Sequence, residues 1–144
     1  MNELTTMYGM NELSRLMEGE IDYITTLDPV DRDQRKKLLV LSQNEPDKKV
    51  SDYIGKQITF SHVYIEKVTI EDDVKKGKLI DAPRTVIETP EGTVTATSEG
   101  FAKSIMMILN CLGKPEDWDE EYWFEVKQVE TRHNRRYFKL QFIE

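Results

Sequence analysis

Basic and aromatic side chains are interleaved near the C-terminus, in a pattern suited to binding an anionic polymer that carries rings. Between residues 127 and 139, five Lys and Arg side chains occur against the single acid Glu130. Side chains alternate between the two faces of a strand, so Tyr137 and Lys139 would share one face while Phe138 lies on the other. A ring can stack on a nucleobase for ~1–3 kcal/mol, and a cation can pair with a phosphate. This combination predicts a surface for single-stranded nucleic acid.

A second group of cations lies in a charged loop around Gly77. Lysines in this loop would adjoin a long strand on which Tyr64 or Lys67 could be exposed, and the sequence leaves open which face of that strand is inward. We assign Trp123 and Phe138 to the core. The candidate nucleic-acid contacts are Tyr64, Lys67, Lys75, Lys76, Lys78, Arg84, Lys127, Arg132, Arg135, Tyr137 and Lys139.

Residues for catalysis are hard to find in this sequence. Neither His62 nor His133 stands in the frame of a Ser/His/Asp or Cys/His site, and no glycine pattern for a nucleotide phosphate occurs. Cys111 falls in an apolar helical segment, where we expect a small buried side chain, and a single cysteine makes a structural zinc site improbable. The acidic runs 71–73 and 116–121 could hold Mg²⁺ for a nuclease, but we interpret both as solvated loops. We therefore predict no enzyme activity, no metal and no cofactor.

The composition is that of one domain that does not enter a membrane. The chain has 144 residues, with 27 acidic and 20 basic side chains and a formal net charge of -7. This acidity argues against general binding to nucleic acid, because phosphate contacts need a concentrated positive surface, which here is only local. No apolar run approaches the ~20 residues of a membrane span. Residues 1–9 lack the features of a secretory signal, so we expect a cytoplasmic protein.

Residues 1–49 are predicted to form a helical N-terminal extension. Asp28 can cap a helix over residues 29–41, with Pro29 at its first position. Residues 10–17 also have helical spacing. The apolar run 38–41 must pack against something, and self-association through this helix is one possibility that the sequence raises.

Residues 50–144 are predicted to form a mainly β domain. The run 58–70 is longer than a usual strand, so we expect it to bend and to serve two halves of a barrel. The other expected elements are a hairpin of strands 84–89 and 93–98, a helix 101–112, and a hairpin of strands 122–130 and 136–143. This order matches an OB-fold, a five-stranded antiparallel barrel with a helix between strands three and four. Another small α+β domain would also fit.

Residues 50–142 resemble the single-stranded DNA-binding proteins of phi-29-like phages and related prophage elements. The resemblance is carried by SDY at 51–53, RTV at 84–86, EGT at 91–93, TATS at 95–98, FAKSI at 101–105, VKQV at 126–129 and YFKLQF at 137–142. It implies an OB-fold that binds single-stranded DNA without sequence specificity during phage DNA replication, in the cytoplasm of an infected bacterium. It implies contacts from exposed tyrosines and basic residues, which fall here on Tyr64, Tyr137, Lys127 and Lys139.

The chain departs from that family in two ways. Residues 1–49 have no counterpart in its shorter members, and no flexible acidic tail follows the final strand. The expected partners are single-stranded DNA, a second copy of the chain and phage replication proteins, with no membrane. The alternative is a non-enzymatic protein-interaction module of a phage or mobile element that acts on a host or replication partner.

Overall fold

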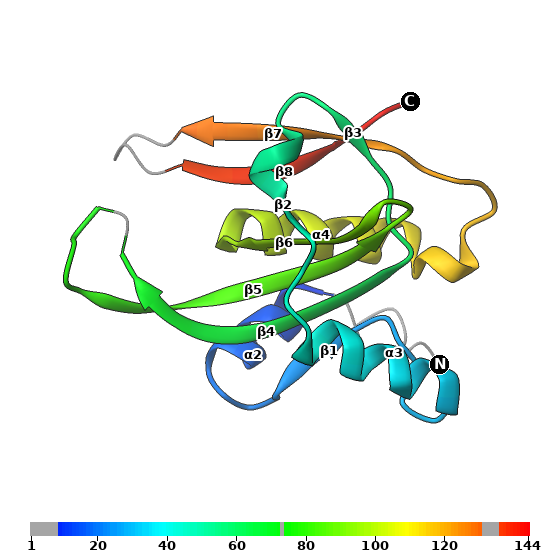
Figure 1. Ribbon diagram of the computed structural model, residues 1–144, viewed down its shortest axis with the longest axis horizontal. Coiled ribbons are helices and arrows are strands. Elements are labelled where there is room, and N and C mark those ends of the chain that lie inside the picture. The colour runs from blue at the N-terminus through cyan, green and yellow to red at the C-terminus, as the bar shows by residue number, and fades with distance from the viewer. Residues whose placement is uncertain (1–8, 73, 131–135) are drawn as a thin grey trace.

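Two β-sheets and three α-helices make up the described part of this computed structural model, residues 9–72, 74–130 and 136–144 (Figure 1). The elements in chain order are α2 (Met10–Met17), β1 (Tyr23–Thr25), α3 (Arg32–Gln43), β2 (Lys48–Lys49), the 3-10 helix η1 (Val50–Tyr53), β3 (Gln57–Ile58), β4 (His62–Glu71), β5 (Leu79–Thr89), β6 (Gly92–Thr97), α4 (Glu99–Leu112), the 3-10 helix η2 (Pro115–Asp117), β7 (Phe124–Glu130) and β8 (Arg136–Phe142). The protein is therefore mainly β, as the sequence predicts.

The larger sheet has the strand order β1-β4-β5-β6-β2, and the smaller one has the order β3-β7-β8. All neighbours are antiparallel except β2 and β6. Strands β4 and β5 stay paired as far as Glu71 and Leu79, whereas β6 pairs with β5 only as far as Arg84. The hairpin over residues 67–83 therefore projects beyond β6, and we call it the first arm.

The long β-favouring run bends, as predicted, and serves both sheets. Strand β3 pairs with β7 in the smaller sheet, and β4 pairs with β5 in the larger one. Between them, the Thr59 hydroxyl donates to the carbonyl of Tyr122 at 2.6 Å, and the Ser61 N–H donates to the carbonyl of Glu88 at 2.9 Å. These bonds give hydrogen-bond partners to polar groups at the point where the chain passes from one sheet to the other.

The predicted five-stranded antiparallel barrel is wrong: the strands form two separate sheets, one of them mixed, and β6 and β8 do not pair. Helix α4 separates them, and its Ser104 occupies the β8 edge: the hydroxyl accepts from the Leu140 N–H at 2.8 Å and donates to the Leu140 carbonyl at 3.3 Å. A helix side chain thus satisfies backbone groups that a barrel would pair with a strand. We call the β7–β8 hairpin the second arm; the two arms belong to different sheets (Figure 1).

Helix α4 carries much of the core. The Ser98 side chain accepts from the N–H of Phe101 and so caps the helix. Phe101, Ile105 and Leu109 are almost fully buried within the main apolar cluster. Leu13, Leu16 and Ile24 belong to the same cluster, so the described part of residues 1–49 contributes to the core and adds β1 and β2 to the larger sheet.

Helix α3 packs on a second, smaller cluster. Its N-cap is Asp31 rather than the predicted Asp28, whose carboxylate instead accepts from the N–H of Val30 in the preceding turn. Leu38 and Leu41 face inward, against Leu27, Tyr64 and Val86. Leu39 and Val40 face outward. None of the helices in the described part of the chain combines the length and apolar character needed to cross a bilayer.

Candidate functional site

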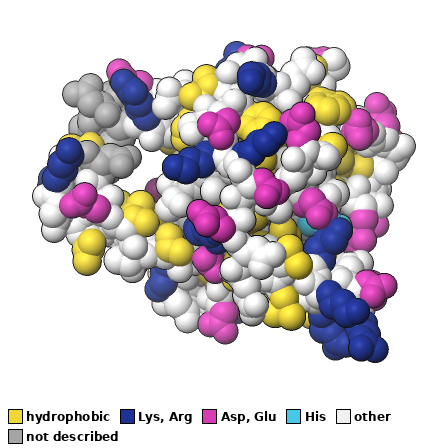
Figure 2. All heavy atoms as spheres, viewed as in Figure 1, with side chains coloured by type: hydrophobic (Ala, Val, Ile, Leu, Met, Phe, Trp, Pro, Cys, Tyr) yellow, Lys and Arg dark blue, Asp and Glu magenta, His cyan; other side chains and the backbone are white. Residues whose placement is uncertain are grey.

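A cleft with a volume of about 1040 Å³ opens between the two arms, with α4 as its floor. Figure 2 shows the surface hollowed between them on the left of the view. The first arm contributes an apolar wall. The principal lining residues are Ile70, Ile80, Ala82 and Pro83 on the first arm, Gly100, Lys103, Ser104 and Met107 on α4, and Arg136, Tyr137 and Lys139 on the second arm.

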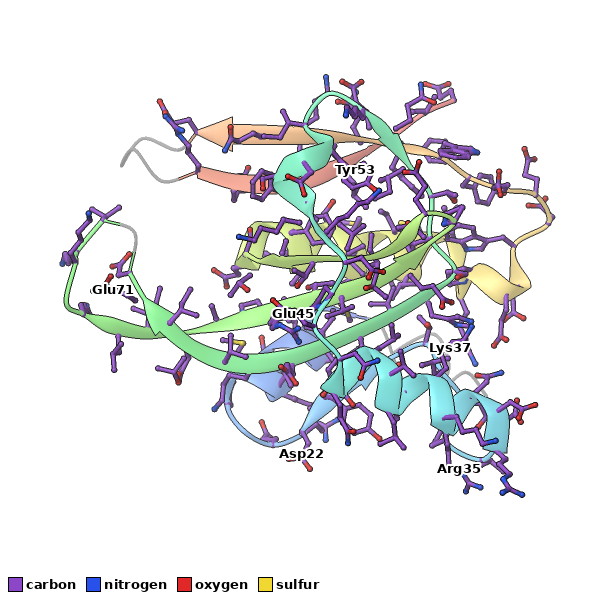
Figure 3. All side chains as sticks on the ribbon, viewed as in Figure 1. Asp22, Arg35, Lys37, Glu45, Tyr53 and Glu71 are labelled. Carbon is purple, nitrogen blue, oxygen red and sulfur yellow. The ribbon has the colours of Figure 1, made fainter. Side chains whose placement is uncertain are left out.

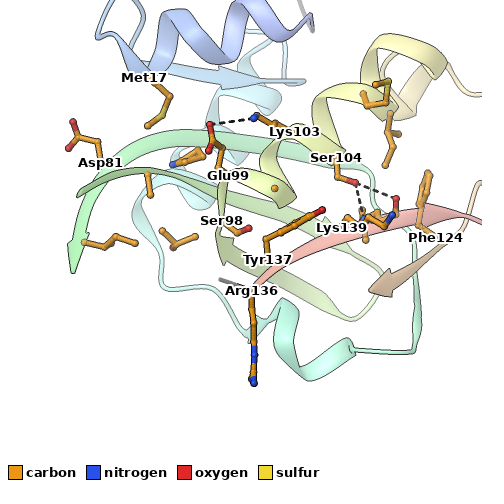
Figure 4. Close-up of a pocket in the computed structure, with 18 of the residues that line it drawn as sticks. Met17, Asp81, Ser98, Glu99, Lys103, Ser104, Phe124, Arg136, Tyr137 and Lys139 are labelled. Atoms are coloured by element: carbon orange, nitrogen blue, oxygen red, sulfur yellow. Dashed lines mark hydrogen bonds and ion pairs between the residues drawn. The ribbon is translucent and has the colours of Figure 1, made fainter. Parts of the chain in front are cut away.

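Gly100 places the ring of Tyr137 at this cleft. A Cβ at position 100 would lie 2.6 Å from Cγ of Tyr137 and closer still to Cδ2, so the ring packs directly on the first turn of α4. The bonds from Ser104 to Leu140 hold the second arm on the same helix (Figure 4). Tyr137 is only partly buried, so this packing fixes a ring that still lines the cleft.

The cleft walls are close to neutral. Among the described lining residues, Asp72, Asp81 and Glu99 oppose Lys103, Arg136 and Lys139. Lys103 lies 3.6 Å from Glu99, and Arg136 is paired with Glu130 at 3.6 Å. Arg136 points away from the other labelled side chains of the cleft in Figure 4. Lys139 has no ion pair within the described residues, and it is the cation that the cleft itself offers to a ligand.

Exposed lysines lie at the tip of the first arm, and a further group of exposed cations lies on α3. Lys75, Lys76 and Lys78 are exposed, and none has an ion pair in the part of the chain that the structure describes. Gly77 has a positive φ of 86° that turns the loop, and its N–H donates to Glu71 at 2.9 Å. The tip therefore presents three exposed lysines, on a loop that also carries the acids Glu71 and Asp72.

Other predicted cations are divided over the surface. Lys127 is opposite Lys139 across β7 and β8, and it is paired with Glu125 at 3.3 Å. Arg84 is paired with Glu66 at 3.2 Å on the larger sheet. Lys67 is exposed and close to Gly19, at the end of α2. The remaining two predicted contacts, Arg132 and Arg135, lie outside the described residues.

Tyr64 does not offer its ring to a ligand. It is only 6% exposed and packs with Leu27, Leu41 and Val86, because α3 covers this face of the sheet. Its hydroxyl donates to Glu66 at 2.9 Å, and burial, aided by this bond, raises the pKa of the Tyr64 hydroxyl well above its usual range. The prediction of an exposed, stacking Tyr64 is therefore corrected by its burial.

Two residues assigned to the interior are exposed. Trp123 is 37% exposed, and its indole N–H donates to Glu121 at 2.9 Å. Cys111 is also exposed, because it lies on the solvent side of α4 together with Met107, whose sulfur is 3.9 Å away. Phe138 is partly buried against the main cluster, in agreement with its assignment to the core.

A second, polar hollow lies near α3, between β5 and the loop that precedes β7. Glu88 is at its centre: it accepts from Lys37 at 3.1 Å and from Ser61 at 3.0 Å, and it lies 3.8 Å from His62. Burial lowers the pKa of His62 below its usual 6.5, against the opposing effect of Glu88. Across residues 9–72, 74–130 and 136–144, no group of three or more His, Cys, Asp or Glu could hold a metal ion.

Sequence reasoning missed the roles of Gly100 and Ser104. Ser104 falls within the helix predicted over residues 101–112, whereas Gly100 lies just before it and belongs to the observed α4, and neither carries a signal of contact with β8. Comparison with family models, curated proteins and solved structures finds no match to this chain.

Proposed function

We propose that the protein binds single-stranded DNA without sequence specificity in the cleft between its two arms. The observation that carries this proposal is a partly exposed ring, Tyr137, in a cleft whose apolar wall belongs to the same arm that carries the exposed Lys75, Lys76 and Lys78 at its tip. Aromatic platforms beside cations are the means by which proteins hold single strands without reading their sequence. The protein would thereby protect exposed strands during replication of phage DNA.

The order of elements supports this proposal. A long divided strand, a hairpin, a helix and a second hairpin follow one another as in an OB-fold, here opened where α4 separates β6 from β8. OB-folds bind oligonucleotides through the loop after the first strand and the loop between the last two. In this order, those are the loops that close the first and second arms.

Because the cleft walls are nearly neutral, phosphates and bases would be bound by different parts of the site. Phosphates would be drawn to the lysines at the tip of the first arm and to Lys139, while bases would contact Tyr137 and the apolar first arm. Each phosphate contact lowers the logarithm of the affinity by ~0.7 per tenfold rise in salt for a single strand. Because few cations are free, we expect a shallower salt dependence than that of a strongly basic protein.

A titration of a fluorescently labelled oligo(dT) of roughly 16 nucleotides, followed by anisotropy at low and high salt, tests the proposal. The double variant Lys75→Gln/Lys76→Gln should reduce the salt slope by about 1.4. The matched control Lys48→Gln/Lys56→Gln removes the same charge at positions that belong to neither arm and should leave the slope unchanged. Absence of binding by the wild type at low salt would refute the proposal.

A protein segment is the second candidate ligand, and the apolar first arm favours it. Ile70, Ile80, Ala82 and Pro83 would suit an apolar side chain as well as a base. In that case the protein is a non-enzymatic interaction module acting on a host or replication protein. The oligo(dT) titration separates the two functions. If the protein binds nucleic acid, the wild type binds oligo(dT) and Tyr137→Leu weakens that binding. If it is an interaction module, neither the wild type nor the variant binds oligo(dT).

A further inference from the structure

The outward face of α3 carries apolar side chains that nothing in the described structure covers. Leu39 is 54% exposed and Val40 is 48% exposed, while their neighbours Leu38 and Leu41 pack inward. Two adjacent exposed aliphatic side chains on one helix face are a small version of the patch that marks an interaction site.

Charges are distributed unevenly on either side of these two residues. Toward the start of α3 the exposed cations are Arg32, Arg35 and Lys36, none with an ion pair within the described residues. After the helix ends, Glu45 is exposed and likewise has no such partner. Figure 3 shows Arg35 and Glu45 toward opposite ends of α3. Asp31 is engaged as the N-cap, and the exposed Asp33 offsets one of these three cations, so this end of α3 keeps an excess of positive charge.

We infer that this face binds a second copy of the chain, with the two α3 helices antiparallel across a twofold axis at Leu39 and Val40. A helix rises ~1.5 Å per residue, so Arg35 lies roughly 7 Å to one side of that axis. Glu45 lies on the other side, two residues beyond the last helical residue, Gln43 (Figure 3). A twofold rotation therefore brings Arg35 of each copy opposite Glu45 of the other. A parallel arrangement would instead place cations opposite cations.

The dimer leaves both proposed binding clefts open. Helix α3 lies at the lower right of the view, whereas the first arm projects to the left (Figure 1). A twofold interface uses the same patch on both copies and closes on itself, so assembly stops at two. The small apolar area predicts a weak dimer that forms with rising concentration. This inference does not depend on what the cleft binds.

Sedimentation velocity of the full chain over a range of concentrations tests the inference. The wild type should shift from monomer to dimer as concentration rises. Arg35→Glu and Glu45→Arg should each weaken self-association about tenfold, because each turns two attractive pairs into two repulsive ones. The double variant Arg35→Glu/Glu45→Arg should restore it, since it exchanges the charges.

Several outcomes would overturn the inference. The first is that the wild type stays monomeric at every concentration. The second is that Arg35→Glu leaves the dimer unchanged. The third is that the charge-exchanged variant remains monomeric although its circular dichroism spectrum is native. Leu39→Ser/Val40→Ser provides an independent test at exposed positions, where the fold does not depend on the side chains removed. It should abolish the dimer, and a retained dimer would exclude this face.

Discussion

The contact between Gly100 and Tyr137 gives a direct test of the cleft. In Gly100→Ala, the new Cβ would lie 2.6 Å from Cγ of Tyr137, whereas carbon atoms pack at ~3.5–4.0 Å, so the ring must retreat by roughly 1 Å or more. Overpacking of this kind costs about 1–3 kcal/mol, and alanine returns up to ~1 kcal/mol of helix propensity. We expect the free energy of unfolding to fall by about 0–3 kcal/mol.

The effect on ligand binding should be larger than the effect on folding. A displaced ring loses stacking of ~1–3 kcal/mol, which corresponds to a roughly 5- to 150-fold rise in the dissociation constant for oligo(dT). Anisotropy titration measures this change, and thermal denaturation measures the fold. Asn110→Ala is the matched control, because it introduces alanine at an exposed position of the same helix outside the cleft.

A double-mutant cycle decides whether the ring carries the effect. In a Tyr137→Leu background, Gly100→Ala should cause little further loss of oligo(dT) affinity, because the two changes act on one interaction. If folded Gly100→Ala binds as tightly as the wild type, the reasoning that links this glycine to a stacking ring is refuted.

Two further predictions concern stability. Ser104→Ala should lower the free energy of unfolding by about 1–3 kcal/mol, measured by urea denaturation, because the N–H and carbonyl of Leu140 lose their partner; no loss would mean that water replaces the hydroxyl. The folded chain keeps His62, which faces Glu88, Lys37 and Glu116, at a pKa below 6.5, so the unfolded chain binds the proton first. Stability should therefore be full above about pH 6.5 and fall as the pH drops through the folded pKa, and His62→Gln should flatten this dependence; an unchanged slope would contradict it.

Local signals in the sequence predict most of the elements. The turn at residues 90–91 gives the β5–β6 hairpin, and the apolar period of residues 101–112 gives α4, which begins at its Ser98 cap. These features depend on residues close together in the chain. The bend of the long strand is also a local signal, since a run of that length exceeds a usual strand.

Contacts between distant segments account for the errors. Strand alternation shows which residues of β4 share a side of the sheet with Tyr64. It does not show that this side is buried, which results from the packing of α3 against it. A barrel would require β6 to pair with β8. Instead, Ser104 on α4 forms hydrogen bonds with the backbone of Leu140 at the edge of β8. The same distance in sequence hides Gly100, whose importance depends entirely on the tyrosine that packs against it.

The division of the two arms between separate sheets has a mechanical consequence. Within the described residues, no β-ladder joins the first arm to the second, and both rest on α4 through side chains. A change in the spacing of the arms therefore stretches side-chain packing rather than breaking backbone hydrogen bonds. Such a cleft is elastic. If it binds single-stranded DNA as proposed, purines and pyrimidines of different size can be accommodated in it at similar cost.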